Sequence, residues 1–190
     1  QNGTLSGGSF DVTGKIYTAT FTPTANVEDT TNVITLGTAW SDSATNAPVS
    51  TSVSGNVSID TKAPTATVAL DKTALKIGET ATLTITFSEV PSNFVEGDDL
   101  TLEHGTLSGG SFDITGKIYT ATFTPDTNVE DSSNVITLGT SWNDSSNNAP
   151  ASTSVSGNVS IDTIPPQFSG FSAGAVIDLG SEGKLIAPVN

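Results

Sequence analysis

The chain repeats itself almost verbatim at a spacing of 102 residues. Residues 3–61 return as residues 105–163, and only 10 of the 59 aligned positions differ. A period of this length is about the size of an independent domain, and it is too long for a solenoid, whose units of about 20–50 residues share one core. Near-identical domains in series provide length or multivalency rather than catalysis. The repeat therefore favours a structural or adhesive role.

The charge of the chain excludes several classes of partner. Among 190 residues, 20 are acidic and 6 are lysines, so the net charge is −14. Because no basic patch is available to neutralise phosphates, we predict no nucleic-acid partner and no anionic membrane surface as partner. The same charge favours solubility and the capture of cations. Cysteine is absent, so neither disulfides nor thiolate metal sites hold the fold.

The sequence contains no run of about 18 apolar residues and no charged-then-apolar leader. We therefore predict no direct membrane insertion by this segment. We expect any anchor or targeting signal to lie elsewhere in the parent protein.

Apolar residues recur with a period of two almost throughout. In Ala81–Phe87 the apolar side chains share one face and threonines occupy the other, which is typical of a half-buried antiparallel strand. Six or seven such runs per repeat, separated by turn residues and with no helical stretch, predict an all-β fold of tandem immunoglobulin-like antiparallel β-sandwiches. We expect the two sheets to meet around Phe87, Phe123 and Trp142.

The domain boundaries fall at a repeated string. Ile59–Pro64 returns as Ile161–Pro166, and a short proline-containing junction predicts a stiff connector. We predict one complete Ig-like domain over residues 62–163. Residues 1–61 then form the C-terminal part of another repeat that lacks its first strands, and residues 164–190 form the N-terminal strands of a further, divergent unit. We expect residues 1–61 alone to be unstable, because their core face would be open.

Two interpretations of these incomplete units stay open. The chain is a slice of a longer array, or its head and tail complete each other between molecules. In the second case, a head that lacks two strands and a tail that supplies two would build a fibre by strand addition. Other copies of the same chain would then be partners.

Several strings occur in the order found in a known family. They are IDT-x-AP at the junction, TLTITFSE at Thr82–Glu89, DDLTLEHGTLSG at Asp98–Gly109 and YTATFTP at Tyr119–Pro125. With these strings the chain resembles the bacterial Ig-like repeats of giant RTX-type, biofilm-associated surface adhesins. The resemblance implies a non-enzymatic extender, secreted or cell-surface attached, whose partners are neighbouring Ig-like domains of the same protein. It also implies Ca²⁺ between the domains.

Acidic residues gather where an Ig-type topology places the junctions. Ca²⁺ prefers about six to eight hard oxygen ligands, so clustered carboxylates are candidate ligands. At the first junction the loop after the second strand, the late loop that bears Asp144 and the preceding linker would meet. The candidates there are Asp60, Glu89, Glu96, Asp98 and Asp99, with Glu28 and Asp29 at the facing end of the preceding domain. At the next junction Asp162 would take the part of Asp60, beside Glu130 and Asp131. The alternative is that these groups are ordinary solvated acids.

Catalysis finds little support in the sequence. The single histidine, His104, is replaced by Asn2 in the first copy, and we expect it at the edge of the core, in phase with Leu100 and Leu102. A calcium-dependent carbohydrate-binding module is a lesser alternative. Its candidate aromatic residues, which we expect to pack in the core instead, are Tyr17, Trp40, Tyr119 and Trp142. Lys15 and Lys117, which are in phase with inward-facing residues, raise an intramolecular isopeptide bond as a further option.

Overall fold

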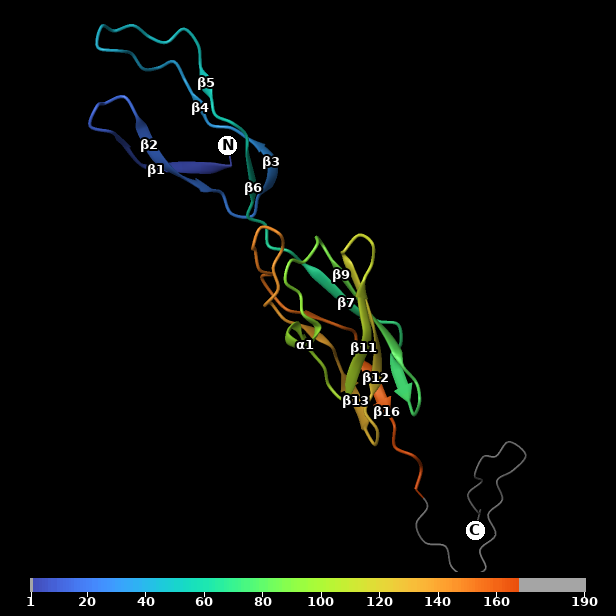
Figure 1. The fold of residues 1–190 in the computed structure, drawn as a ribbon. Coiled ribbons are helices and arrows are strands. Elements are labelled where there is room, and N and C mark those ends of the chain that lie inside the picture. The colour runs from blue at the N-terminus through green and yellow to red at the C-terminus, as the bar shows by residue number, and fades with distance from the viewer. Residues whose placement is uncertain (1, 168–190) are drawn as a thin grey trace, which may run out of the picture.

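The computed structural model describes residues 2–167, and nearly all of its regular elements are strands (Figure 1). The first unit contains β1 (Gly3–Phe10), β2 (Tyr17–Pro23), β3 (Glu28–Asn32), β4 (Thr35–Leu36), β5 (Ser52–Val53) and β6 (Val57–Asp60). The second contains β7 (Ala66–Leu70), β8 (Ala74–Lys76), β9 (Ala81–Phe87), α1 (Glu96–Asp99), β10 (Leu100–Thr101), β11 (Gly105–Phe112), β12 (Ile118–Pro125), β13 (Glu130–Asn134), β14 (Thr137–Leu138), β15 (Ser154–Val155) and β16 (Val159–Asp162). The prediction of an all-β fold is confirmed, whereas the four-residue helix α1 was not expected from the alternating pattern.

The second unit is a sandwich of short sheets. One sheet has the antiparallel order β11-β12-β9-β7, and the others have the orders β13-β16-β8 and β10-β14-β15. Only the pair β16–β8 is parallel among the described strands. The Ser154 hydroxyl donates to the Ala66 carbonyl at 2.7 Å and so links β15 to β7 across the sandwich.

The predicted core is confirmed. Leu83, Ile85 and Phe87 leave β9 on its inner face and are almost fully buried. They pack against Phe123 and Trp142, and the Trp142 ring meets the Phe87 ring edge-on with centroids 4.9 Å apart. Such aromatic pairs add stabilisation beyond their buried area, so this cluster anchors the two layers to each other.

The first unit has the same strand pairs as its twin but not the same burial. β1 pairs with β2, β3 with β6 and β4 with β5, and no further described strand joins them. Trp40 is 52% exposed, whereas its equivalent Trp142 is 1% exposed. Tyr17 is 58% exposed, whereas Tyr119 is 6% exposed. The aromatic residues expected to pack do so in the second unit only.

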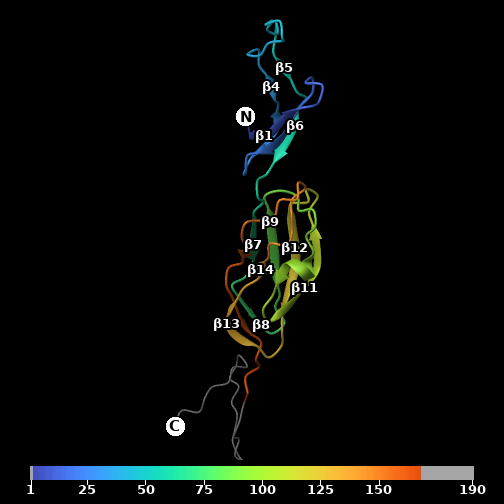
Figure 2. The same cartoon turned by 90° about the vertical axis from the view of Figure 1, so that its left-hand side faces the viewer.

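The two units follow each other end to end in both views of the chain (Figures 1 and 2). The segment after β6 connects them, and Pro64 within it is buried. The divergent unit predicted for residues 164–190 lies almost wholly outside the described residues.

His104 corrects one expectation. Its side chain is about half exposed, and its φ of 52° is in the left-handed region. The chain turns between β10 and β11, which breaks the alternation that began at Leu100. His104 therefore leaves the core, and its Nε2 lies 3.3 Å from a carboxylate oxygen of Asp131.

Candidate metal centre

Three carboxylates from distant parts of the sequence meet where the linker enters the second unit. Asp60 ends β6, Glu89 follows β9, and Asp144 lies in the loop after Trp142. One oxygen of each lies within 4.8 Å of the other two. Asp144 is buried, and the other two are partly buried. We call these three residues the junction triad.

The loop around Asp144 holds its carboxylate in place. Oδ1 accepts hydrogen bonds from the Ser146 and Asn148 amides at 2.8 and 2.9 Å, and Oδ2 accepts one from Asn148 Nδ2 at 2.9 Å. Asp42 makes the same kinds of bond with Ala44 and Asn46 in the first unit, although it is exposed there. The loop conformation is therefore a local property of the repeated sequence.

Two contacts bring the linker against this loop and the end of β9. Asn148 Nδ2 lies 3.2 Å from the Asp60 carbonyl oxygen and 3.4 Å from its Oδ1, so one amide bridges Asp60 and Asp144. The Ser88 amide donates to the Thr65 carbonyl at 2.8 Å, which holds the linker beside Glu89.

The negative charge of the triad is only partly compensated. The pKa of Glu89 is raised, first because burial disfavours its charged form and then because Asp144, Asp60 and Glu28 repel it. Lys62 offsets part of this repulsion, and its Nζ forms an ion pair with Glu28 at 3.2 Å. A divalent cation would relieve the repulsion more completely.

The donors of the triad suit a hard cation. Carboxylate oxygens are the ligands that Ca²⁺ and Mg²⁺ prefer, and the triad contains no nitrogen or sulfur ligand that would select zinc. The triad also joins residues on both sides of the linker. A cation bound to it would therefore connect the two units.

Other residues predicted for this junction lie apart from the triad. Glu96, Asp98 and Asp99 form most of α1. Glu96 accepts a hydrogen bond from the Tyr119 hydroxyl, and buried Asp99 accepts one from the Val95 amide at 2.7 Å. Two of these three carboxylates thus have structural partners within the second unit.

Glu28 and Asp29 lie on β3 of the first unit, but only one of them takes part in the electrostatics of the junction. Glu28 is opposite Asp60 in the strand register and contributes to the repulsion at Glu89. Asp29 instead accepts hydrogen bonds from the side chains of Asn2 and Thr31.

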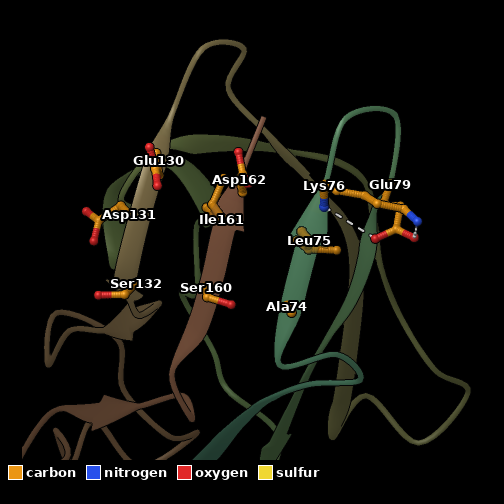
Figure 3. A pocket seen from close by; sticks show the side chains of 10 residues that line it. All are labelled: Ala74, Leu75, Lys76, Glu79, Glu130, Asp131, Ser132, Ser160, Ile161 and Asp162. Atoms are coloured by element: carbon orange, nitrogen blue, oxygen red, sulfur yellow. Dashed lines mark hydrogen bonds and ion pairs between the residues drawn. The ribbon is translucent and has the colours of Figure 1, made fainter. Parts of the chain in front are cut away.

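The residues predicted for the second junction lie at the opposite end of the second unit. Glu130 is opposite Asp162 in the β13–β16 register, while the Asp131 side chain points away from Asp162 (Figure 3). A shallow groove of about 350 Å³ runs beside them towards β8. Ile164 occupies the position that Lys62 has at the first junction. Within residues 2–167, no third carboxylate completes a triad at this end.

The alternative binding functions meet specific obstacles. In the second unit Trp142 and Tyr119 are buried, so neither presents a ring to a sugar. Lys117 Nζ donates to the Ser88 carbonyl at 3.0 Å, which is not a partner for an isopeptide bond. No helix in the described part of the chain is long and apolar enough to cross a membrane.

A family model gives the chain its place among known proteins. The model for a bacterial Ig-like domain matches twice, over residues 1–59 and 60–161. The chain belongs to the bacterial Ig-like domain family. Domains of this family are generally non-enzymatic structural domains and are typically extracellular or surface-exposed. No curated protein and no solved structure matches the chain.

Proposed function

We propose that this bacterial Ig-like chain is an extender segment of a surface adhesin, in which Ca²⁺ bound by the junction triad fixes the angle between successive units. One observation carries the proposal: Asp60 comes from the preceding unit, whereas Glu89 and Asp144 come from the following one. Because the ligands lie on both sides of the linker, a bound cation would hold the two units in a fixed orientation.

The wider context of the junction supports this role. A buried proline and the Asn148 bridge already limit the freedom of the linker, so the cation would have little entropy left to remove. Extracellular calcium modules commonly bind with dissociation constants of about 10⁻⁴ to 10⁻³ M. Such an affinity suits a protein outside the cell.

Calcium titration by calorimetry, with small-angle scattering of the same samples, tests the proposal. We expect one site, and a more extended and more uniform scattering profile with Ca²⁺ than with a chelator. Asp144→Asn should abolish both effects. Asp42→Asn is the matched control, because it changes the same loop in the first unit at a place without a triad, and it should leave both unchanged.

Glu89→Gln separates a metal site from an ordinary acidic cluster. Without calcium this variant should be more stable than the natural chain, because it removes repulsion from a partly buried group. At 10 mM Ca²⁺ the natural chain should gain about 1–3 kcal/mol by linkage, and the variant should gain far less. An equal gain for both proteins, or scattering profiles that ignore the chelator, would contradict the proposal.

A fibre subunit joined by strand addition is the second candidate. The exposed aromatic residues of the first unit favour it, since they leave a core face uncovered. The tail expected to supply the added strands lies almost wholly outside the described residues. Sedimentation at increasing protein concentration distinguishes the two functions, because an extender stays monomeric and a fibre subunit polymerises.

A further inference from the structure

The residue that precedes β1 and β11 differs between the two repeats in a chemically important way. It is Asn2 in the first unit and His104 in the second. The backbone carbonyl of each accepts a hydrogen bond at 2.9 Å, from the Thr24 amide in the first unit and from the Asp126 amide in the second. The two side chains therefore start from equivalent places in the fold, and their contacts can be compared directly.

In the first unit the Asn2 side chain joins two oxygen atoms. Its Nδ2 lies 2.8 Å from Asp29 Oδ2 and 2.9 Å from Asn32 Oδ1. These two oxygens thus converge on one point, where Asn2 places a nitrogen donor. The equivalents of Asp29 and Asn32 in the second unit are Asp131 and Asn134.

In the second unit His104 contacts only one of the two equivalent oxygens. Its Nε2 lies 3.3 Å from Asp131 Oδ2. Asn134 Oδ1, in contrast, is buried and has no hydrogen-bond donor among residues 2–167. Asn134 as a whole is only 1% exposed, so bulk water does not reach this oxygen either. A buried acceptor without a donor costs free energy, and nearly all such groups in native proteins have a partner.

The surrounding hydrogen bonds fix the direction of both oxygens. Asn134 Nδ2 donates to the carbonyls of Asp131 and Val159 at 3.2 and 3.1 Å, so a flipped amide would bring oxygen against oxygen. Asp131 Oδ1 accepts from the Ser133 amide at 2.9 Å, and Oδ2 is the atom on the side of His104. The first unit has the same bonds at the equivalent positions. The two oxygens therefore keep the convergent arrangement seen there.

We propose that His104, Asp131 and Asn134 form a binding site for a divalent transition-metal ion of the zinc class. The ion would take the place that the Asn2 nitrogen has in the first unit, between the two oxygens and beside the imidazole. An imidazole nitrogen suits zinc and related ions, whereas Ca²⁺ prefers oxygen ligands alone. The inference goes beyond the proposed function and does not depend on calcium.

The charge and exposure of the site favour an ion that enters from solvent. The side chains of His104 and Asp131 are 47% and 36% exposed, while Asn134 lies beneath them. Asp131 points away from Asp162, so its carboxylate is not directed at the second junction (Figure 3). Within residues 2–167, no lysine forms an ion pair with Asp131. Three protein ligands would leave a further coordination position to water.

Zinc titration of the full chain by calorimetry tests the proposal, with excess Ca²⁺ present to occupy the junction triad. We expect one zinc site. His104 is the only histidine and cysteine is absent, so His104→Asn removes the only imidazole and restores the residue of the first unit. This variant and Asp131→Asn should each bind zinc at least about 30-fold more weakly. Glu79→Gln, which removes one negative charge at the same end of the unit, is the control and should bind as the natural chain does.

Stability gives a second readout, which separates a metal from a water molecule bound to Asn134. Without zinc, His104→Asn should unfold at a higher urea concentration than the natural chain, because Asn134 Oδ1 regains a donor. With zinc the order should reverse, because the ion stabilises only the protein that binds it. A water molecule in place of the metal predicts no reversal, and that result would contradict the proposal.

NMR of the natural chain identifies the ligands without any substitution. Zinc should shift the signals of the His104 imidazole nitrogens and of the Asn134 side-chain amide together. Three further outcomes would overturn the proposal. They are no saturable zinc binding, equal zinc affinity of His104→Asn and the natural chain, and a shift of the His104 signals alone, which would indicate an isolated surface imidazole.

Discussion

Identical residues at equivalent positions of the two repeats, 102 residues apart, show how the surrounding structure changes the same side chain. Tyr119 is buried, and its hydroxyl donates to Glu96, whereas the identical Tyr17 is more than half exposed. Burial raises the pKa of Tyr119 above its ordinary value, and the hydrogen bond to Glu96 and the charge of that residue raise it further. The side chain is the same in both units, so the difference arises from the surrounding packing.

Tyr119→Phe should lower the free energy of unfolding of the second unit by about 0.5–1.5 kcal/mol, the usual net value of a buried hydrogen bond. Urea unfolding followed by Trp142 fluorescence measures the change. Tyr17→Phe is the control and should have no effect on this transition. Equal effects of the two variants would contradict the assignment.

Asp113, in the turn between β11 and β12, should make the stability of the second unit depend on pH. The pKa of Asp113 is lowered from 3.8, first by the hydrogen bond from the Ile118 amide and then by Thr115. The equivalent Asp11 has a pKa of about 2, lowered most by the Thr13 hydroxyl. Because the folded state holds the ionised form, the stabilising contribution of Asp113 is complete above its ordinary pKa and is lost as the pH falls below it.

The stability difference between the natural chain and Asp113→Ala should therefore shrink as the pH falls below about 4. Urea unfolding at a series of pH values measures it. Carboxyl NMR provides the independent check that Asp11 and Asp113 titrate below ordinary aspartates. A difference that stays constant down to pH 2 would show that the carboxylate has another role.

At the scale of elements, the sequence YTATFTP forms a strand in both units but a core in only one. β2 and β12 share these seven residues and the same register with their hairpin partners. Phe123 is 1% exposed because β9 and the opposite layer cover it. The alternation of apolar and polar residues is sufficient for the strand to form. Burial of its inner face depends on other elements of the unit, such as β9.

Phe123→Ala should destabilise the second unit by about 3–5 kcal/mol, the usual cost of deleting a buried aromatic ring. Phe21→Ala should leave the main cooperative transition unchanged, since its surroundings are only partly closed. Both values come from urea unfolding curves. A large effect of Phe21→Ala would mean that the first unit is covered in solution.

At the scale of the whole molecule, the two units should differ in local stability even though their sequences nearly coincide. Protection of amides depends on how many contacts must break to expose them. We expect slow hydrogen exchange in β9 and β12 and fast exchange in β2 and β6. The measurement is native-state exchange followed by mass spectrometry. Equal protection of β2 and β12 would contradict the difference in packing.

Much of the fold could be read from the sequence because it depends on short-range patterns. Alternation within Ala81–Phe87 predicts a strand and its inner face, and the near-identical repeat predicts the size of the domain. The helix α1 escaped prediction because a single turn is too short to show helical periodicity. His104 was misplaced because the alternation ends at a turn that nothing in the apolar pattern marks.

The candidate metal site was likewise predicted from the sequence only in part. Composition and spacing identified Asp60 and Glu89 as candidate ligands and placed the loop that bears Asp144 near them, but they did not predict Asp144 itself as a ligand. Only the tertiary structure decided that these three converge while Glu96 and Asp99 bond within the second unit. Residues 60, 89 and 144 are far apart in sequence, and the distance between such residues depends on packing, which no local pattern encodes.

By itself, then, the sequence determined strands, repeat length and the place of the junction, because each follows from neighbouring residues. The tertiary structure decided which of two nearly identical halves has a core. Trp40 and Trp142 occupy equivalent positions in the repeat, yet one is exposed and the other buried. The physical reason is that hydrophobic burial requires a complementary surface, and only the second unit has its complement among the described residues.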